Sequence, residues 1–220
     1  MAQRKFSWEE AVKYGWRATL DHLGFFIKAM IIVFVISISL GLVTKMTQES
    51  MPVLSLITNL TGVFFSLLFG VGLIKIYLKI CEGKQPELRD LLFGITPGLM
   101  LRYLFAVLLY TLIFIGGFIL FIIPGIIWLM QFQFCTYLVI DKGLGPVAAL
   151  KKSSRITKGA KWDLLVLTCL SVLINLAGVL ALGIGLFVTI PLTMLALTSA
   201  YRKLLSESGV AVAQTSAQVH

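Results

Sequence analysis

The side chains most able to contact a ligand or a partner helix are uncharged polar residues that recur inside apolar segments. One set is Ser55, Asn59, Gly62, Ser66 and Gly70. A spacing of three or four residues places all five on one face of a helix. Such a face either packs closely against another helix, with small residues and an Asn amide at the contact, or lines a polar cavity. We expect close packing, with a pore or ligand cavity as the alternative.

A second set of the same kind lies further along the chain. Ser171, Asn175 and Gly178 repeat the spacing, and Asn175-Leu-Ala-Gly178 resembles Asn59-Leu-Thr-Gly62. Gln131 and Gln133 are two positions apart in another apolar segment and therefore point to opposite helix faces. At least one of these two amides is expected to bond to a neighbouring helix.

Catalytic and metal-binding constellations are not evident. The two histidines, His22 and His220, have no Cys, Ser or carboxylate at a spacing that suits nucleophilic catalysis or metal ligation. Acidic residues are absent from the middle of the apolar segments, which disfavours proton-coupled and ion-coupled transport. The sequence therefore predicts no enzyme activity, no cofactor and no metal.

Composition indicates a membrane protein. Mean hydropathy is +0.95 and 13% of residues are charged, against about 25% in soluble domains. The pattern predicts an all-α polytopic transmembrane bundle, one domain over 1–205 with a disordered polar tail over 206–220. Its six predicted spans are 23–43, 53–74, 103–123, 125–140, 164–183 and 186–201.

The distribution of positive charge predicts the orientation. Of 19 Lys and Arg residues, only Lys45 falls in a segment expected to face the far side. Cytoplasmic loops carry the excess of Lys and Arg, so both termini should be cytoplasmic, in the cytoplasmic membrane of a prokaryote. The net charge of +9 borders the membrane, which favours anionic lipid headgroups over nucleic acid as the partner.

Prolines and a short repeat divide the chain into three helical hairpins. Pro52, Pro124 and Pro191 each lie near the start of a predicted return helix, where a proline fits the first turn. Before the first and third hairpins, Ala11-Val-Lys-Tyr-Gly-Trp-Arg-Ala-Thr19 matches Ala149-Leu-Lys-Lys-Ser-Ser-Arg-Ile-Thr157 at Ala, Lys, Arg and Thr. Internal duplication explains this match, and residues 86–93 occupy the same place before the middle hairpin.

We interpret the segment before each hairpin as an amphipathic helix lying at the membrane surface, where basic and aromatic side chains gather. The alternative is an irregular solvated loop. The residues expected to contact lipid headgroups or a partner are Lys13, Trp16, Arg17, Lys151, Lys152, Arg155, Lys158, Lys161 and Trp162.

Three stretches resemble a known group of membrane modules. These are Pro124-Gly125-Ile-Ile, the run from Ala148 to Gly159 followed by Trp162, and the Pro191 segment ending at Tyr201. They are similar to prokaryotic multi-pass proteins that include the membrane domain attached to some glycerophosphodiester phosphodiesterases. The catalytic domain of those enzymes has no counterpart here, so the resemblance implies a six-span membrane module without enzyme activity.

These observations lead to two functional hypotheses. The first is a non-enzymatic membrane protein whose basic cytoplasmic face engages anionic lipids or a protein partner, in scaffolding, membrane organisation or envelope homeostasis. That partner would be a membrane protein, a cytoplasmic protein or a second copy of the chain. The alternative is a small transporter or channel for an uncharged or lipid-like solute, with a cavity lined by Asn59, Asn175 and Gln131.

Overall fold

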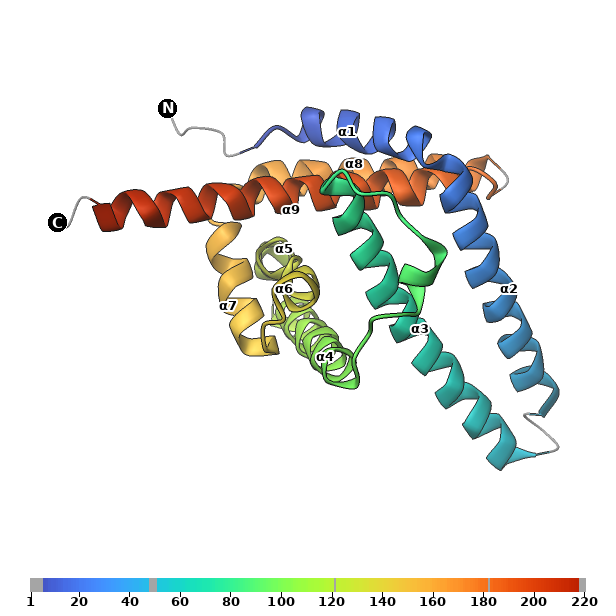
Figure 1. The fold of residues 1–220 in the computed structure, drawn as a ribbon. Helices are drawn as coiled ribbons and strands as arrows, with labels where there is room; N and C mark the ends of the chain where they lie inside the picture. The colour runs from blue at the N-terminus through green and yellow to red at the C-terminus, as the bar shows by residue number, and fades with distance from the viewer. Residues whose placement is uncertain (1–5, 48–50, 121, 182, 218–220) are drawn as a thin grey trace.

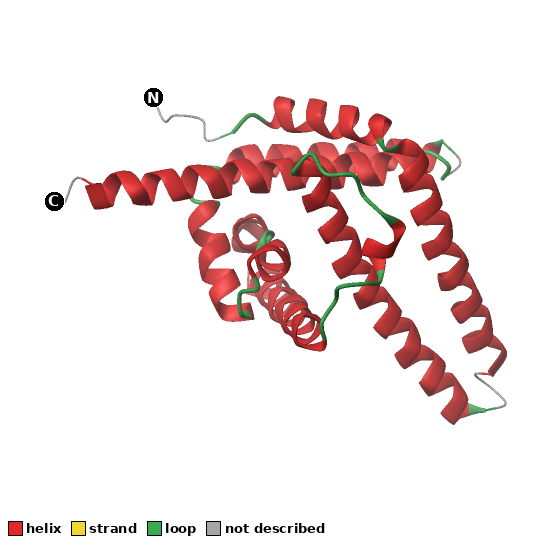
Figure 2. Cartoon of the chain, viewed as in Figure 1, coloured by secondary structure: helices red, strands yellow, loops and turns green. Residues whose placement is uncertain are grey.

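The computed structural model describes residues 6–47, 51–120, 122–181 and 183–217, and all regular secondary structure in these ranges is helical, as Figures 1 and 2 show. The all-α prediction is confirmed. The helices in chain order are α1 (Trp8–Asp21), α2 (Leu23–Thr47), α3 (Pro52–Cys81), the 3-10 turn η1 (Leu88–Leu91), α4 (Pro97–Leu120), α5 (Ile122–Phe132), α6 (Cys135–Lys142), α7 (Pro146–Ile156), α8 (Lys161–Leu180) and α9 (Leu186–Ala217).

Four helices of the described chain are long and apolar enough to cross a membrane. They are Leu23–Thr47, Val53–Cys81, Pro97–Ile119 and Lys161–Leu180, which belong to α2, α3, α4 and α8. The chain is therefore an integral, multi-pass membrane protein with four candidate spans. The prediction of six spans is wrong.

The two lost spans fail for different physical reasons. The segment 125–140 is interrupted at Gln133 and Phe134, which leaves α5 with 11 residues and α6 with 8. A helix of that length rises about 17 Å at most, against a hydrocarbon core of about 30 Å. The segment 186–201 lies within α9, but its apolar run ends at Arg202 after a rise of about 24 Å.

The predicted disordered tail also differs from the structure. Helix α9 continues through residues 206–217, and only 218–220 lie outside the described residues. Residues 206–217 contain no proline. Extending a helix that packing has already nucleated needs only propagation, which is far less costly than nucleation.

The helices form three consecutive units that pack in a cyclic order. Each hairpin packs on itself: α2 with α3, α4 with α5, and α8 with α9. Each unit is a hairpin together with the segment that precedes it. That segment packs on the return segment of another unit: α1 on α9, η1 on α3 and α7 on α6. In Figure 1, α1 and α8 run beside α9, while α2 and α3 project away from them as a hairpin.

The two copies of the sequence repeat share one pattern of burial. The buried positions pair as Ala11 with Ala149, Gly15 with Ser153, Ala18 with Ile156, and Thr19 with Thr157; the exposed cations pair as Lys13 with Lys151 and Arg17 with Arg155. This agreement supports an internal duplication, and it confirms that both segments are helices. The middle unit departs from the expectation, because residues 86–93 form only the short turn η1, closed by a capping box between Glu87 and Asp90.

A partly buried polar cluster joins the ends of α3 and α6 to the middle of α9. Tyr201 of α9 is fully buried, and its hydroxyl donates to the Asp141 carboxylate of α6 at 2.8 Å. The Arg202 guanidinium donates to Glu82, which follows α3, and lies 3.3 Å from Asp141. Burial, and then the hydrogen bond to Asp141, raises the pKa of Tyr201, so the phenol remains a donor at neutral pH.

The contact of α1 with α9 generates a stability prediction. A Cβ added at Gly15 would lie 2.5 Å from the carbonyl oxygen of Leu192, whereas one added at Gly24 meets nothing within 4 Å. Gly15→Leu should therefore lower the free energy of unfolding by about 1 to 3 kcal/mol through overpacking. Thermal melting in detergent measures this loss, with Gly24→Leu as the matched control. Equal melting of the two variants would contradict the described packing of α1.

Candidate functional site

Helix α7 positions the largest group of basic side chains. Pro146 occupies its first turn after Gly145, a position where the missing proline N–H costs nothing. Its inner face, Ala149, Leu150, Ser153 and Ile156, is buried against α4, α5 and α6. The apolar face of this predicted interfacial helix thus contacts protein, and the basic face is the one left exposed.

The interruption between α5 and α6 creates acceptors that α7 satisfies. The last four carbonyl groups of an α-helix have no partner within the helix, and the Gln131 carbonyl is one of them. Ser153 Oγ donates to this oxygen at 2.9 Å, and Thr157 Oγ1 lies 3.2 Å from it. Two buried hydroxyls of α7 therefore cap the end of α5.

The Gln131 side chain continues this network to the surface. Its Nε2 donates to Ser154 Oγ at 2.7 Å, and Lys161 Nζ donates to its Oε1 at 2.8 Å. The prediction that one of the two amides bonds to a neighbouring helix is confirmed for Gln131. Gln133 points elsewhere, and its Nε2 is buried without a hydrogen-bond partner among the described residues.

An open hollow of about 470 Å³, which we call the α7 hollow, lies beside this network. Its volume is within the range of small-molecule sites of about 300 to 1,000 Å³. Its walls are Gln131, Phe132, Val147, Leu150, Lys151, Ser154 and Arg155. Lys151 and Arg155 are exposed and lie one helical turn apart, next to the exposed Val147. The hollow thus combines two cations with an apolar wall.

The positive charge of α7 is not neutralised by nearby acidic residues in the sequence. No Asp or Glu occurs between Asp141 and Asp163. Within the described part of the chain, Lys151, Lys152 and Arg155 form no ion pair. Like charges one turn apart repel by about 0.2 to 0.5 kcal/mol, so an external anion would stabilise this face.

The remaining predicted headgroup residues are distributed over two surfaces. Lys158 and Trp162 are exposed near the α7 hollow, Trp162 by 80% of its surface. Lys13, Trp16 and Arg17 are exposed on α1, which packs on α9 instead. Lys203 Nζ of α9 donates to Glu10 of α1 at 2.8 Å, and this hydrogen bond lowers the pKa of Glu10.

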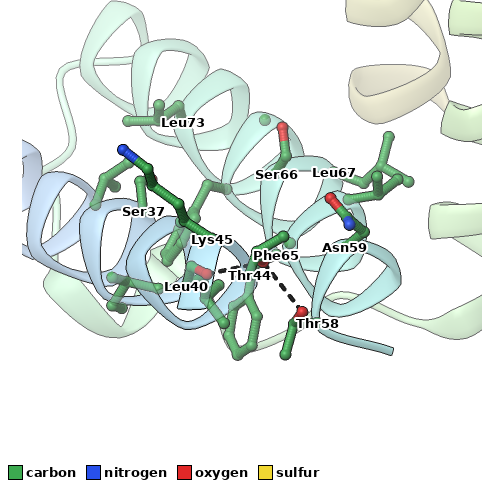
Figure 3. A pocket seen from close by; sticks show the side chains of 17 residues that line it. Ser37, Leu40, Thr44, Lys45, Thr58, Asn59, Phe65, Ser66, Leu67 and Leu73 are labelled. Carbon is green, nitrogen blue, oxygen red and sulfur yellow. Dashed lines mark hydrogen bonds between the residues drawn. The ribbon is translucent and has the colours of Figure 1, made fainter. Parts of the chain in front are cut away.

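The polar face of α3 mostly lines open space. Asn59, Gly62, Ser66 and Gly70 border a groove of about 780 Å³ between α2 and α3, shown in Figure 3. A Cβ at Gly62 would meet nothing within 4 Å, whereas one at Gly70 would lie 2.7 Å from the Tyr103 hydroxyl. The close packing expected for this face occurs at Gly70, and the cavity alternative describes Gly62.

The matching face of α8 packs against α9. Asn175 Nδ2 donates to Thr193 Oγ1 at 3.2 Å, and a Cβ at Gly178 would lie 2.5 Å from Thr189 Oγ1. Ser171 instead donates within its own helix, to the Leu167 carbonyl at 2.8 Å. The structure places Asn59, Gln131 and Asn175 at three separate sites, so these residues do not line one common cavity.

Sequence reasoning missed the apolar and hydroxyl parts of the α7 hollow. Phe132, Val147 and Ser154 carry no charge and follow no motif, and Ser154 meets Gln131 across 23 residues of sequence. No group of three or more His, Cys, Asp or Glu side chains in the described residues could hold a metal ion.

Comparisons of the chain with protein-family models, curated proteins and solved structures find no match. The resemblance to the membrane domain of glycerophosphodiester phosphodiesterases therefore stays a prediction.

Gln131 and Gln133 provide an internal test of the network. Gln131→Leu removes the partner of Ser154 and Lys161 and should lower the free energy of unfolding by about 1 kcal/mol. Gln133→Leu removes a buried group without a partner and should be neutral or stabilising. Melting of both variants in detergent measures the difference, and a greater loss for Gln133→Leu would contradict the described hydrogen bonds.

Proposed function

We propose that this chain is a non-enzymatic membrane protein that binds anionic lipid headgroups on a basic cytoplasmic face and thereby organises the membrane around it. The α7 hollow carries this proposal, because Lys151 and Arg155 lie there without ion-pair partners among the described residues, beside an apolar wall. The ligand class that fits both parts is an anionic amphiphile.

The two cations would contribute differently to headgroup binding. An Arg guanidinium can donate two parallel hydrogen bonds to a phosphate, whereas a Lys ammonium acts as a point charge. Each basic residue close to an anionic surface contributes about 1 kcal/mol, over a Debye length of about 8 Å at physiological salt. Phe132 and Val147 would contact the first part of an acyl chain.

The orientation follows the positive charge. We place both termini and α7 in the cytoplasm and Lys45 on the opposite side, because Lys and Arg are concentrated in cytoplasmic loops. This orientation requires the short return segments, α5–α6 packed on α4 and α9 packed on α8, to bring the chain back to the cytoplasmic side after α4 and α8 have crossed. The alternative, a small transporter or channel for an uncharged or lipid-like solute, is less well supported, since Asn59, Gln131 and Asn175 lie at separate sites. A protein partner on the same basic face would need to be acidic.

Lipid binding can be tested with charge-matched variants. The double variant Lys151→Gln, Arg155→Gln should bind nanodisc phosphatidylglycerol about 30-fold more weakly, from two contributions of about 1 kcal/mol each. The control Lys84→Gln, Arg89→Gln removes the same charge from residues that already pair with Glu82 and Glu87. Its affinity should change little. Equal losses in both variants, or equal binding to phosphatidylcholine, would contradict a specific anionic site.

Cysteine accessibility tests the orientation. Cys81, Cys135 and Cys169 are first replaced, and single cysteines are then introduced at Met46, which is 79% exposed, or at the exposed Ala148. An impermeant thiol reagent should label Met46→Cys on intact cells and Ala148→Cys only after permeabilisation. The reverse pattern would place α7 outside the cell.

A further inference from the structure

The groove between α2 and α3 is separate from the α7 hollow and differs from it in shape. The α2 wall runs from Val33 to Lys45 along one helix face, and the α3 wall runs from Thr58 to Leu73. Thr44 Oγ1 donates to Thr58 Oγ1 at 3.0 Å and closes the groove at its Lys45 end. Figure 3 shows this bond between the two walls.

The length of the α2 wall is close to the thickness of one leaflet of a bilayer. Val33 and Lys45 are twelve residues apart, which is a rise of about 18 Å. One leaflet of a hydrocarbon core of about 30 Å is about 15 Å thick. Because both walls belong to candidate membrane spans, the groove lies at the depth of acyl chains. Among the described residues that line the groove, Lys45 is the one cation, and it is at the end where a headgroup would lie.

Two glycines make the groove open. Gly41 of α2 and Gly62 of α3 lie on opposite walls of the groove. Each is about one helical turn from the Thr44–Thr58 bond, on the side away from Lys45. A Cβ at either glycine would meet nothing within 4 Å. The missing side chains at these two positions leave space for a narrow apolar group.

The cross-section identifies the kind of occupant. Spread over about 18 Å, the volume of about 780 Å³ corresponds to a mean cross-section of about 43 Å². A helix with side chains is about 10 to 12 Å across, or roughly 80 to 110 Å², about twice the mean cross-section of the groove. An extended acyl chain is much narrower than a helix and fits.

We infer that this groove binds a glycerophospholipid of the leaflet on the Lys45 side, with one acyl chain along the groove and the phosphate at Lys45. Lys45 is exposed and, among the residues that the structure describes, it forms no ion pair. Near that end, the Thr58 hydroxyl and the Asn59 amide line the groove at the depth expected for the glycerol esters of the lipid. This lipid site is independent of the proposed headgroup site on α7.

The test measures phospholipid retained by the full-length protein after detergent purification, by native mass spectrometry. All variants carry Lys151→Gln and Arg155→Gln, so that α7 does not contribute. Gly41→Leu with Gly62→Leu fills the groove and should remove one bound phospholipid per chain. The matched control is Gly24→Leu with Gly116→Leu, whose Cβ positions also meet open space but lie outside the groove. It should retain the lipid.

Lys45→Gln keeps the test decisive if the filled variant fails to fold, because this exposed substitution removes only the charge. It should lower lipid retention several-fold, as expected for loss of about 1 kcal/mol at the headgroup. Retention by the filled variant equal to its control would overturn the proposal. A change from dimer to monomer with lipid retained would also overturn it and would assign the groove to a second copy.

Discussion

The arrangement of three helices depends on the contact of Asp141, at the end of α6, with Tyr201 and Arg202 in the middle of α9. It joins α6 to α9, and the pairing of Arg202 with Glu82 adds the end of α3. A buried carboxylate is costly to leave unpaired, so these helices cannot separate without exposing or stranding a charge. Two further placements depend on this junction. Helix α7 follows Asp141 after a short turn at the left-handed Gly143, and α1 packs along the α9 segment that carries Tyr201 and Arg202.

The same small and polar spacing produced different contacts in α3 and α8 because of distance from the hairpin turn. Gly178 is close to the turn that joins α8 to α9, and it lies against Gly185 and Thr189. Gly62 is further from the end of its hairpin, beyond the bond between Thr44 and Thr58, and α2 and α3 are apart there. Helical spacing predicts which residues share a face, but the separation of the facing helix decides whether that face is packed or open.

Local patterns predicted the repeated helices and the exposure of their cations, because residues three and four positions apart are enough to define the two faces of an amphipathic helix. Lys13, Arg17, Lys151 and Arg155 are exposed as that spacing requires. The interruption at Gln133 and Phe134 is not marked by a Gly or Pro, and the amides of Gln131 and Gln133 alone do not predict that a helix ends there. It depends on the hydroxyls of Ser153 and Thr157, 22 and 26 residues from Gln131, which donate to the freed Gln131 carbonyl. Contacts over that separation cannot be predicted from local spacing.

The broken return segment and the basic face of α7 have one physical origin. Ending α5 early leaves a carbonyl that needs donors, and the inward hydroxyls of α7 supply them. Directing those hydroxyls inward turns Lys151 and Arg155 outward, four residues apart on one face. Continuous α5 and α6 would have no need of this cap, and α7 would be free to place its apolar face in the membrane. The interruption that removes a predicted span is therefore also what turns Lys151 and Arg155 of α7 outward.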